Sequence, residues 1–107
     1  MKVRLKYSLV LCLAAALVTP AFAQSSGVDI YKAKCLMCHG PDGLANNSVG
    51  KAMKVPSFKD PAVIKATDAE LFAAVKNGKG SKMPAQNGKL TDAQIKAVIE
   101  YVRTLEK

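Results

Sequence analysis

The chain is poor in the residues that build most metal sites and disulfide frameworks. Its 107 residues contain one histidine, three cysteines and no tryptophan. A structural zinc site needs four ligands, and beyond residue 23 the chain offers only Cys35, Cys38 and His39 among the usual nitrogen and sulfur donors. Two cysteines also cannot form the several disulfides that stabilise many small secreted domains. These scarcities exclude a four-ligand zinc site and a disulfide-rich fold.

Acidic residues and aromatic residues are scarce as well. Eight acidic residues face 16 basic ones, which gives a formal charge of +8, and without Lys2, Arg4 and Lys6 the charge falls to +5. A nucleic-acid binder would place base-stacking aromatics among its basic residues. The aromatics beyond residue 23 are instead scattered at core-like positions, namely Tyr31, Phe58, Phe72 and Tyr101. We therefore expect no nucleic-acid partner.

The chain also lacks an apolar run long enough to span a bilayer. A spanning helix needs about 20 apolar residues, and the uncharged segment 8–18 is about half that length. It follows three basic residues and precedes Ala21-Phe22-Ala23, where small residues occupy the two positions that a signal peptidase recognises. This predicts a Sec-type signal peptide over 1–23 and a mature domain over 24–107 with no membrane span; the alternative is an uncleaved anchor.

The main functional motif is Cys35-Leu36-Met37-Cys38-His39-Gly40. A Cys-x-x-Cys-His sequence is typical of c-type haem attachment, because two thiols one helical turn apart can each form a thioether to a haem vinyl group. The adjoining His39 imidazole is then the proximal iron ligand. The mature domain, with 84 residues, is small enough to need a cofactor or a covalent link to complete its core.

Two other interpretations of the cysteines remain open. A thioredoxin-like redox pair requires a strand–helix–strand context, and the flanking residues show no β-rich run. A structural disulfide between Cys35 and Cys38 would leave His39 without a role. Haem attachment is the interpretation that uses all three residues.

The periodicity of the mature chain predicts an all-α domain of three to four helices wrapped around one covalently bound haem. Serine caps and capping boxes mark helix starts, and Ile95, Val98, Ile99, Val102 and Leu105 form one apolar stripe on the last helix. A long irregular loop over 44–60 is expected to wrap one side of the haem. The expected helices are 28–35 behind Ser25 or Ser26, a short turn at 61–66, a helix to Asn77 behind Thr67, and a last helix behind Thr91.

Three methionines and one proline are candidates around the iron. Met37 lies on the attachment turn, on the wrong side to reach over the ring, whereas Met53 and Met83 both lie in loops. Met83 is favoured as the distal ligand, because Pro84 stiffens its loop and a capped helix follows. A carbonyl near Pro56 is a candidate acceptor for the second ring N–H of His39, which would fix the imidazole plane; an ordinary turn proline is the alternative.

Taken together, the motifs resemble those of the class I monohaem cytochromes c of bacteria, over essentially the whole mature chain. The resemblance rests on Gly27-x-x-x-Tyr31-x-x-x-Cys35-x-x-Cys38-His39-Gly40, Pro56-Ser-Phe58, Gly80-x-x-Met83-Pro84, and Leu90-Thr91-Asp92 leading into Tyr101-Val-Arg103. It implies Met83 as the distal ligand and a crossing of the terminal helices in which Gly27 admits Tyr101. The tryptophan that these proteins often carry near the haem is missing here.

The resemblance implies a periplasmic one-electron carrier, not an enzyme. Ligation by His39 and Met83 would close both axial positions and raise the reduction potential. Lys34, Lys51, Lys79 and Lys82 flank the haem-binding segments and suit an acidic redox partner, although a solvated face is the alternative for each. A monomer is the simplest expectation. The competing functions are a dedicated haem subunit of a dehydrogenase or oxidase and an open-site haem sensor.

Overall fold

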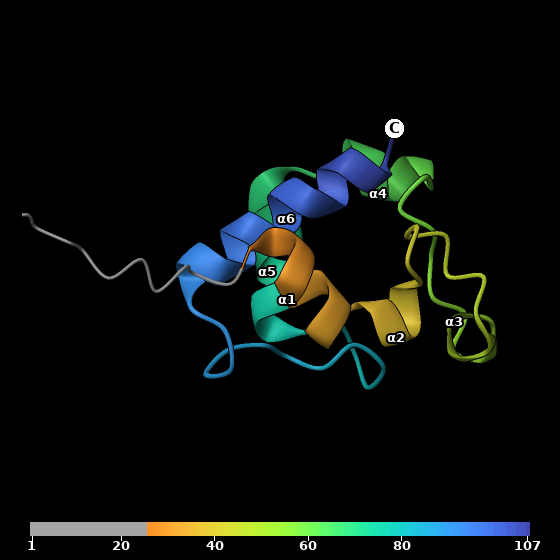
Figure 1. Ribbon diagram of the computed structural model, residues 1–107, viewed down its shortest axis with the longest axis horizontal. Coiled ribbons are helices and arrows are strands. Elements are labelled where there is room, and N and C mark those ends of the chain that lie inside the picture. Colours follow the sequence, from red (N-terminus) through yellow and green to blue (C-terminus); the bar gives the residue numbers. More distant parts are fainter. Residues whose placement is uncertain (1–25) are drawn as a thin grey trace, which may run out of the picture.

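The computed structural model describes residues 26–107, which form helices joined by turns and loops (Figure 1). The described part contains no strand, only isolated bridges between Lys79 and Met83 and between Asn87 and Leu90. The all-α class is therefore confirmed. The helices are α1 (Gly27–Lys34), α2 (Leu36–His39), α3 (Ser48–Ala52), α4 (Pro61–Lys65), α5 (Asp68–Asn77) and α6 (Asp92–Leu105).

The predicted signal peptide, residues 1–23, lies outside the described residues. Among residues 26–107, no helix has both the length and the apolar character that crossing a bilayer requires.

Local capping signals determine where the longer helices begin. Asp29 N donates to Ser26 Oγ at 3.2 Å, so Ser26 caps α1. Thr67 and Thr91 each form a complete capping box, with Glu70 and Gln94 respectively returning a side-chain oxygen to the threonine N–H. The predictions from these residues are confirmed, with α1 beginning one residue earlier than expected.

Two short helices, α2 and α3, were not predicted as separate elements. The expectation that the chain is irregular throughout 44–60 is wrong at Ser48–Ala52, because the Asn47 side chain accepts from Gly50 N at 3.0 Å and caps α3. Gly50 packs closely, since a Cβ there would lie 2.7 Å from the Cys38 carbonyl oxygen. The loop thus turns helical where it packs against α2.

The core forms where α1 crosses α6 (Figure 1). A Cβ at Gly27 would overlap the Ala97 carbonyl oxygen and lie 3.3 Å from Tyr101 Cβ, so a glycine is required at the crossing. Next to it, the rings of Tyr31 and Tyr101 meet edge to face at 5.1 Å. The apolar stripe of α6 faces this core as predicted, with Ile95, Val98, Ile99 and Val102 buried and Leu105 partly buried.

Arg103 on α6 connects the last helix to the corner between α4 and α5. Its guanidinium donates to the carbonyl oxygens of Val63 and Ala66 and to the Asp68 carboxylate. It also pairs with Glu106 one turn later, at 2.8 Å. The last carbonyls of a helix lack part of their intrahelical bonding, and Arg103 adds a side-chain donor to Val63 O, which also accepts from Ala66 N, and to Ala66 O.

Candidate functional site

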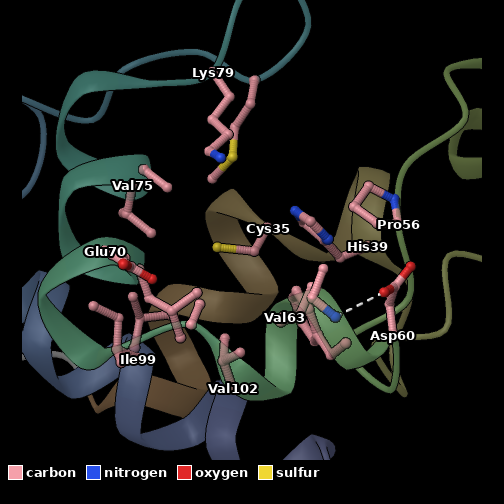
Figure 2. A pocket seen from close by; sticks show the side chains of 17 residues that line it. Cys35, His39, Pro56, Asp60, Val63, Glu70, Val75, Lys79, Ile99 and Val102 are labelled. Atoms are coloured by element: carbon pink, nitrogen blue, oxygen red, sulfur yellow. Dashed lines mark hydrogen bonds between the residues drawn. The ribbon is translucent and has the colours of Figure 1, made fainter.

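A cavity of about 440 Å³ opens beside Cys35, at the junction of α1 and α2 (Figure 2). Residues of α2, the 56–60 segment, α4, α5, the 79–83 segment and α6 complete its wall. Carbon-rich side chains make most of its wall, so a ligand there would be largely removed from water. Its lining residues are Cys35, His39, Pro56, Phe58, Asp60, Ala62, Val63, Ala66, Glu70, Leu71, Ala74, Val75, Lys79, Met83, Val98, Ile99 and Val102. Figure 2 shows Cys35 and His39 projecting into this space from one side, with Val75 and Lys79 on other sides.

The chain breaks its helical path at Cys35, which ends α1 and begins α2. Cys35 N donates to Tyr31 O at 2.9 Å, and His39 N donates to Cys35 O at 3.0 Å. Gly40, with a φ of 78°, then ends the short helix in a left-handed conformation that favours glycine. The one-turn helix α2 thereby fixes the spacing of Cys35, Cys38 and His39.

Both cysteines of the motif are free thiols, so the structure does not contain the disulfide considered above. Burial, with a smaller effect from Cys38, raises the pKa of the Cys35 thiol to about 11. Cys35 is therefore protonated at neutral pH in this environment. Cys35 lines the cavity, whereas Cys38, which lies on α2, is not one of the lining residues.

The His39 imidazole is half-buried and stacks on Phe58. The ring centroids lie 4.6 Å apart with an interplanar angle of 24°. Burial lowers the pKa of His39, which favours the neutral imidazole that coordinates metals. Its Nδ1 atom is buried and has no hydrogen-bond partner among the residues that the structure describes. The predicted bond from His39 to the carbonyl near Pro56 is thus not formed here, although Pro56 lines the cavity, and it stays a prediction.

Met83 reaches the cavity from a short hairpin-like turn. Lys79 N donates to Met83 O at 3.0 Å, and Met83 N donates to Lys79 O at 3.2 Å. A Cβ at Gly78 would lie 2.5 Å from the Met83 carbonyl oxygen, so the turn packs directly against the end of α5. The Met83 backbone is therefore fixed by its two hydrogen bonds with Lys79 and by its close packing against Gly78.

The other two methionines do not line the cavity. Met53 uses its carbonyl oxygen to accept from Lys82 Nζ at 3.2 Å, which ties the 53–54 turn to the 79–83 turn. Met37 is 73% exposed on α2. Of the three candidates, only Met83 shares a cavity with His39 and Cys35.

Two contacts at the site were not assigned from the sequence. Phe58 was expected only as a core residue, and it contacts the imidazole itself. Tyr31 donates its hydroxyl hydrogen to Gly40 O at 2.5 Å, joining α1 to the residue after His39. The Pro56-Ser-Phe58 sequence was the available signal for the first contact, but only the fold brings residue 58 to residue 39.

The residues of the cavity fit a covalently attached haem. Two thiols and an imidazole lie on one helical turn, the wall is apolar, and the thioether of Met83 lines the same space. The buried Nδ1 of His39 makes no hydrogen bond within residues 26–107, so this part of the chain does not engage this nitrogen. Within residues 26–107, no three His, Cys, Asp or Glu side chains are grouped so that they could hold a metal ion by themselves.

Sequence comparison identifies related proteins over most of the chain. Residues 22–102 match the family described as "Cytochrome C oxidase, cbb3-type, subunit III". The cbb3-type cytochrome c oxidase subunit FixP of Azorhizobium caulinodans is 33% identical over 84 residues, which cover 78% of this chain. The chain spans only 27% of the length of that protein. Cytochrome c6 of Leptolyngbya boryana is 37% identical over 78 residues, covering 73% of this chain and 87% of the relative.

Solved structures show the same architecture. The KustC0563 c-type cytochrome superposes with a TM-score of 0.70 and 28% identity, covering 77% of this chain and 99% of the other. The c-type cytochrome XoxG from Methylobacterium extorquens AM1 superposes with a TM-score of 0.59 and 27% identity, covering 77% of this chain and 49% of the other.

Proposed function

The chain belongs to the cytochrome c family, whose members carry covalently bound haem c and transfer electrons, and we propose that it is a periplasmic one-electron carrier with His39 and Met83 as axial ligands. One observation carries the proposal: Cys35, His39 and Met83 line a single apolar cavity. When bound, the haem supplies the one-electron couple of its iron. The protein supplies attachment, ligands and a water-poor environment.

Cys35 and Cys38 attach the cofactor in this proposal. Each thiol would hold the haem by adding across one of its vinyl groups, with the sulfur bonded to one vinyl carbon and the hydrogen to the other, and with no net redox change. Cys35 caps α2 and Cys38 lies on it beside His39, so the thioethers and the imidazole would be placed by the same helical turn. Covalent attachment prevents loss of the cofactor from so small a domain.

His39 and Met83 then set the electronic properties of the site. A neutral His39 imidazole would donate to the iron, and a carbonyl near Pro56 that accepts from Nδ1 would strengthen that donation. The thioether of Met83 favours the reduced state and raises the potential. With both axial positions closed, the protein has little geometry to change between oxidation states, which favours fast electron transfer.

The location and the partner form part of the same proposal. The leader-like residues 1–23 support export, and cleavage after Ala23 would release residues 24–107 as a monomer into the periplasm. Exposed lysines flank the segments that line the cavity, and we assign to them the docking of a redox partner with an acidic surface. They are Lys34, Lys51, Lys79 and Lys82.

The proposal is tested by expressing the full chain with a haem-maturation system. The periplasmic product should begin at Gln24, carry the mass of one haem and titrate reversibly with one electron. Cys35→Ala or Cys38→Ala should leave at most one thioether and a poorly folded product. A stable, fully folded protein without haem, from a variant lacking both cysteines, would contradict the proposal.

A second candidate function is a haem-carrying subunit of an oxidase complex. The match to the cbb3-type subunit III family and to FixP favours it. The two functions differ in one observable: a dedicated subunit co-purifies with its complex from native membranes, whereas a carrier is recovered alone. An open-site haem sensor would instead show high-spin iron in the isolated protein.

A further inference from the structure

Phe58 makes the closest aromatic contact at the site. Its ring lies face to face with the His39 imidazole, with centroids 4.6 Å apart and planes 24° from parallel. The Phe58 side chain is only 7% exposed, so its ring is buried in the core. Because both rings are flat, rotation of the imidazole about its Cβ–Cγ bond would drive its edge into the face of Phe58.

Three contacts confine Phe58, two with Gly43 and one with Tyr31. Its backbone N–H donates to Gly43 O at 2.9 Å. A Cβ at Gly43 would overlap Phe58 Cδ2, so the ring lies directly on the glycine backbone, which has a φ of 75°. On a further side, the Tyr31 ring meets Phe58 edge to face with a centroid distance of 6.2 Å. A ring confined in this way can restrain a neighbour.

The backbone around His39 is fixed by hydrogen bonds, but its ring is not. Tyr31 donates its hydroxyl hydrogen to Gly40 O, and Ala45 N donates to His39 O at 2.8 Å. The ring atom Nδ1 has no hydrogen-bond partner within residues 26–107. Within residues 26–107 the stack on Phe58 restrains the plane of the imidazole, and it would act beside the predicted bond from Nδ1 to the carbonyl near Pro56.

We propose that Phe58 is a positioning residue for the axial histidine: its ring, backed by Tyr31 and seated on Gly43, sets the plane of the His39 imidazole. The inference rests on the proposed ligation of haem iron by His39. Residues around a metal-bound histidine commonly fix its ring orientation by hydrogen bonding. In this chain an aromatic face adds a second restraint on the ring by packing.

The test compares Phe58→Leu with a matched control, Phe72→Leu, in the haem-loaded protein. Phe72 lies on α5 outside the cavity, where Lys76 Nζ approaches its ring at 5.6 Å. Electron paramagnetic resonance of the oxidised protein reports the orientation of axial ligand planes. We expect Phe58→Leu to shift and broaden the g values while the iron stays low-spin, and Phe72→Leu to leave them unchanged.

Unchanged g values in a folded Phe58→Leu protein would overturn the inference and leave His39 ligation intact. High-spin or haem-free unmutated protein would instead overturn the proposed function. If Phe58→Leu fails to fold, nuclear magnetic resonance of the unmutated reduced protein decides. Cross-relaxation between the ring protons of Phe58 and His39, together with slow flipping of the Phe58 ring, supports the stack, and its absence contradicts it.

Discussion

Lys79 and Met83 are joined by two reciprocal backbone hydrogen bonds, Lys79 N to Met83 O at 3.0 Å and Met83 N to Lys79 O at 3.2 Å. The pair closes a tight turn at the end of α5, and both residues line the cavity that contains Cys35 and His39. The turn holds the Met83 backbone beside the cavity, as a distal ligand requires. Met53 also has a hydrogen-bonded backbone but does not line the cavity, and this separates the two residues.

Met83→Ala should therefore give a high-spin iron, lower the reduction potential and admit carbon monoxide. The physical reason is loss of the thioether that closes the distal position and favours the reduced state. Optical spectra and a redox titration measure these effects. Met53→Ala is the matched control, and it should lower stability with ligation unchanged, because Met53 does not line the cavity. The reverse pattern would overturn the assignment of Met83.

Tyr31 should make stability fall at alkaline pH. Burial raises its pKa above the ordinary tyrosine value of about 10. Below pH 10 both folded and unfolded chains hold the phenol proton. Above it the unfolded chain loses the proton while the folded chain keeps it, so the free energy of unfolding decreases as pH rises. Denaturant unfolding of the haem-loaded protein between pH 8 and 12 measures the slope.

Tyr31→Phe removes the titrating group and keeps the ring. We expect this variant to be less stable at pH 7, because Gly40 O loses its donor. Its stability should also fall less steeply than that of the parent above pH 10. Equal slopes in the two proteins would show that Tyr31 does not carry the alkaline dependence.

Arg103→Ala should cost about 1–3 kcal/mol of unfolding free energy, since it removes the guanidinium donors to the carbonyls of Val63 and Ala66, although Val63 O keeps Ala66 N as a donor. The pair with Asp68 adds little, because that carboxylate is largely exposed. Lys76→Ala is the control: it breaks an exposed pair with Asp92 and should cost less than about 1 kcal/mol. Equal losses would mean that the carbonyl contacts are unimportant.

Gly27→Ala should destabilise the crossing of α1 and α6. The added methyl group would overlap the Ala97 carbonyl oxygen, and backbone atoms cannot move aside as a flexible side chain can. Overpacking of this kind typically costs about 1–3 kcal/mol. Thermal unfolding of the haem-loaded protein measures it, and an unchanged midpoint would contradict the close approach.

The sequence predicts those parts of this fold that depend on neighbouring residues. The caps at Ser26, Thr67 and Thr91 are local hydrogen bonds over three residues, and the apolar stripe of α6 follows from helical periodicity. The motif of Cys35, Cys38 and His39 is local as well. Each of these signals is complete within a few residues, so no knowledge of the tertiary structure is needed to recognise it.

The parts that escaped prediction depend on residues far apart in the chain. Arg103 binds groups 35–40 residues away, and Phe58 meets His39 only after the 44–60 segment has folded back. Helix α3 forms inside that segment because Asn47 caps it and Gly50 fits against Cys38 O. The local motif Pro56-Ser-Phe58 sets Phe58 apart from Phe72, but it does not indicate that the Phe58 ring contacts the imidazole.

The most direct test of His39 and Met83 ligation is an optical spectrum of the haem-loaded protein in both oxidation states. Ligation by His39 and Met83 should give low-spin bands in the reduced protein. The oxidised protein should show a weak band near the red end, which reports a bond between iron and methionine sulfur and disappears in Met83→Ala. Bound haem with a high-spin spectrum and no such band would contradict this ligation.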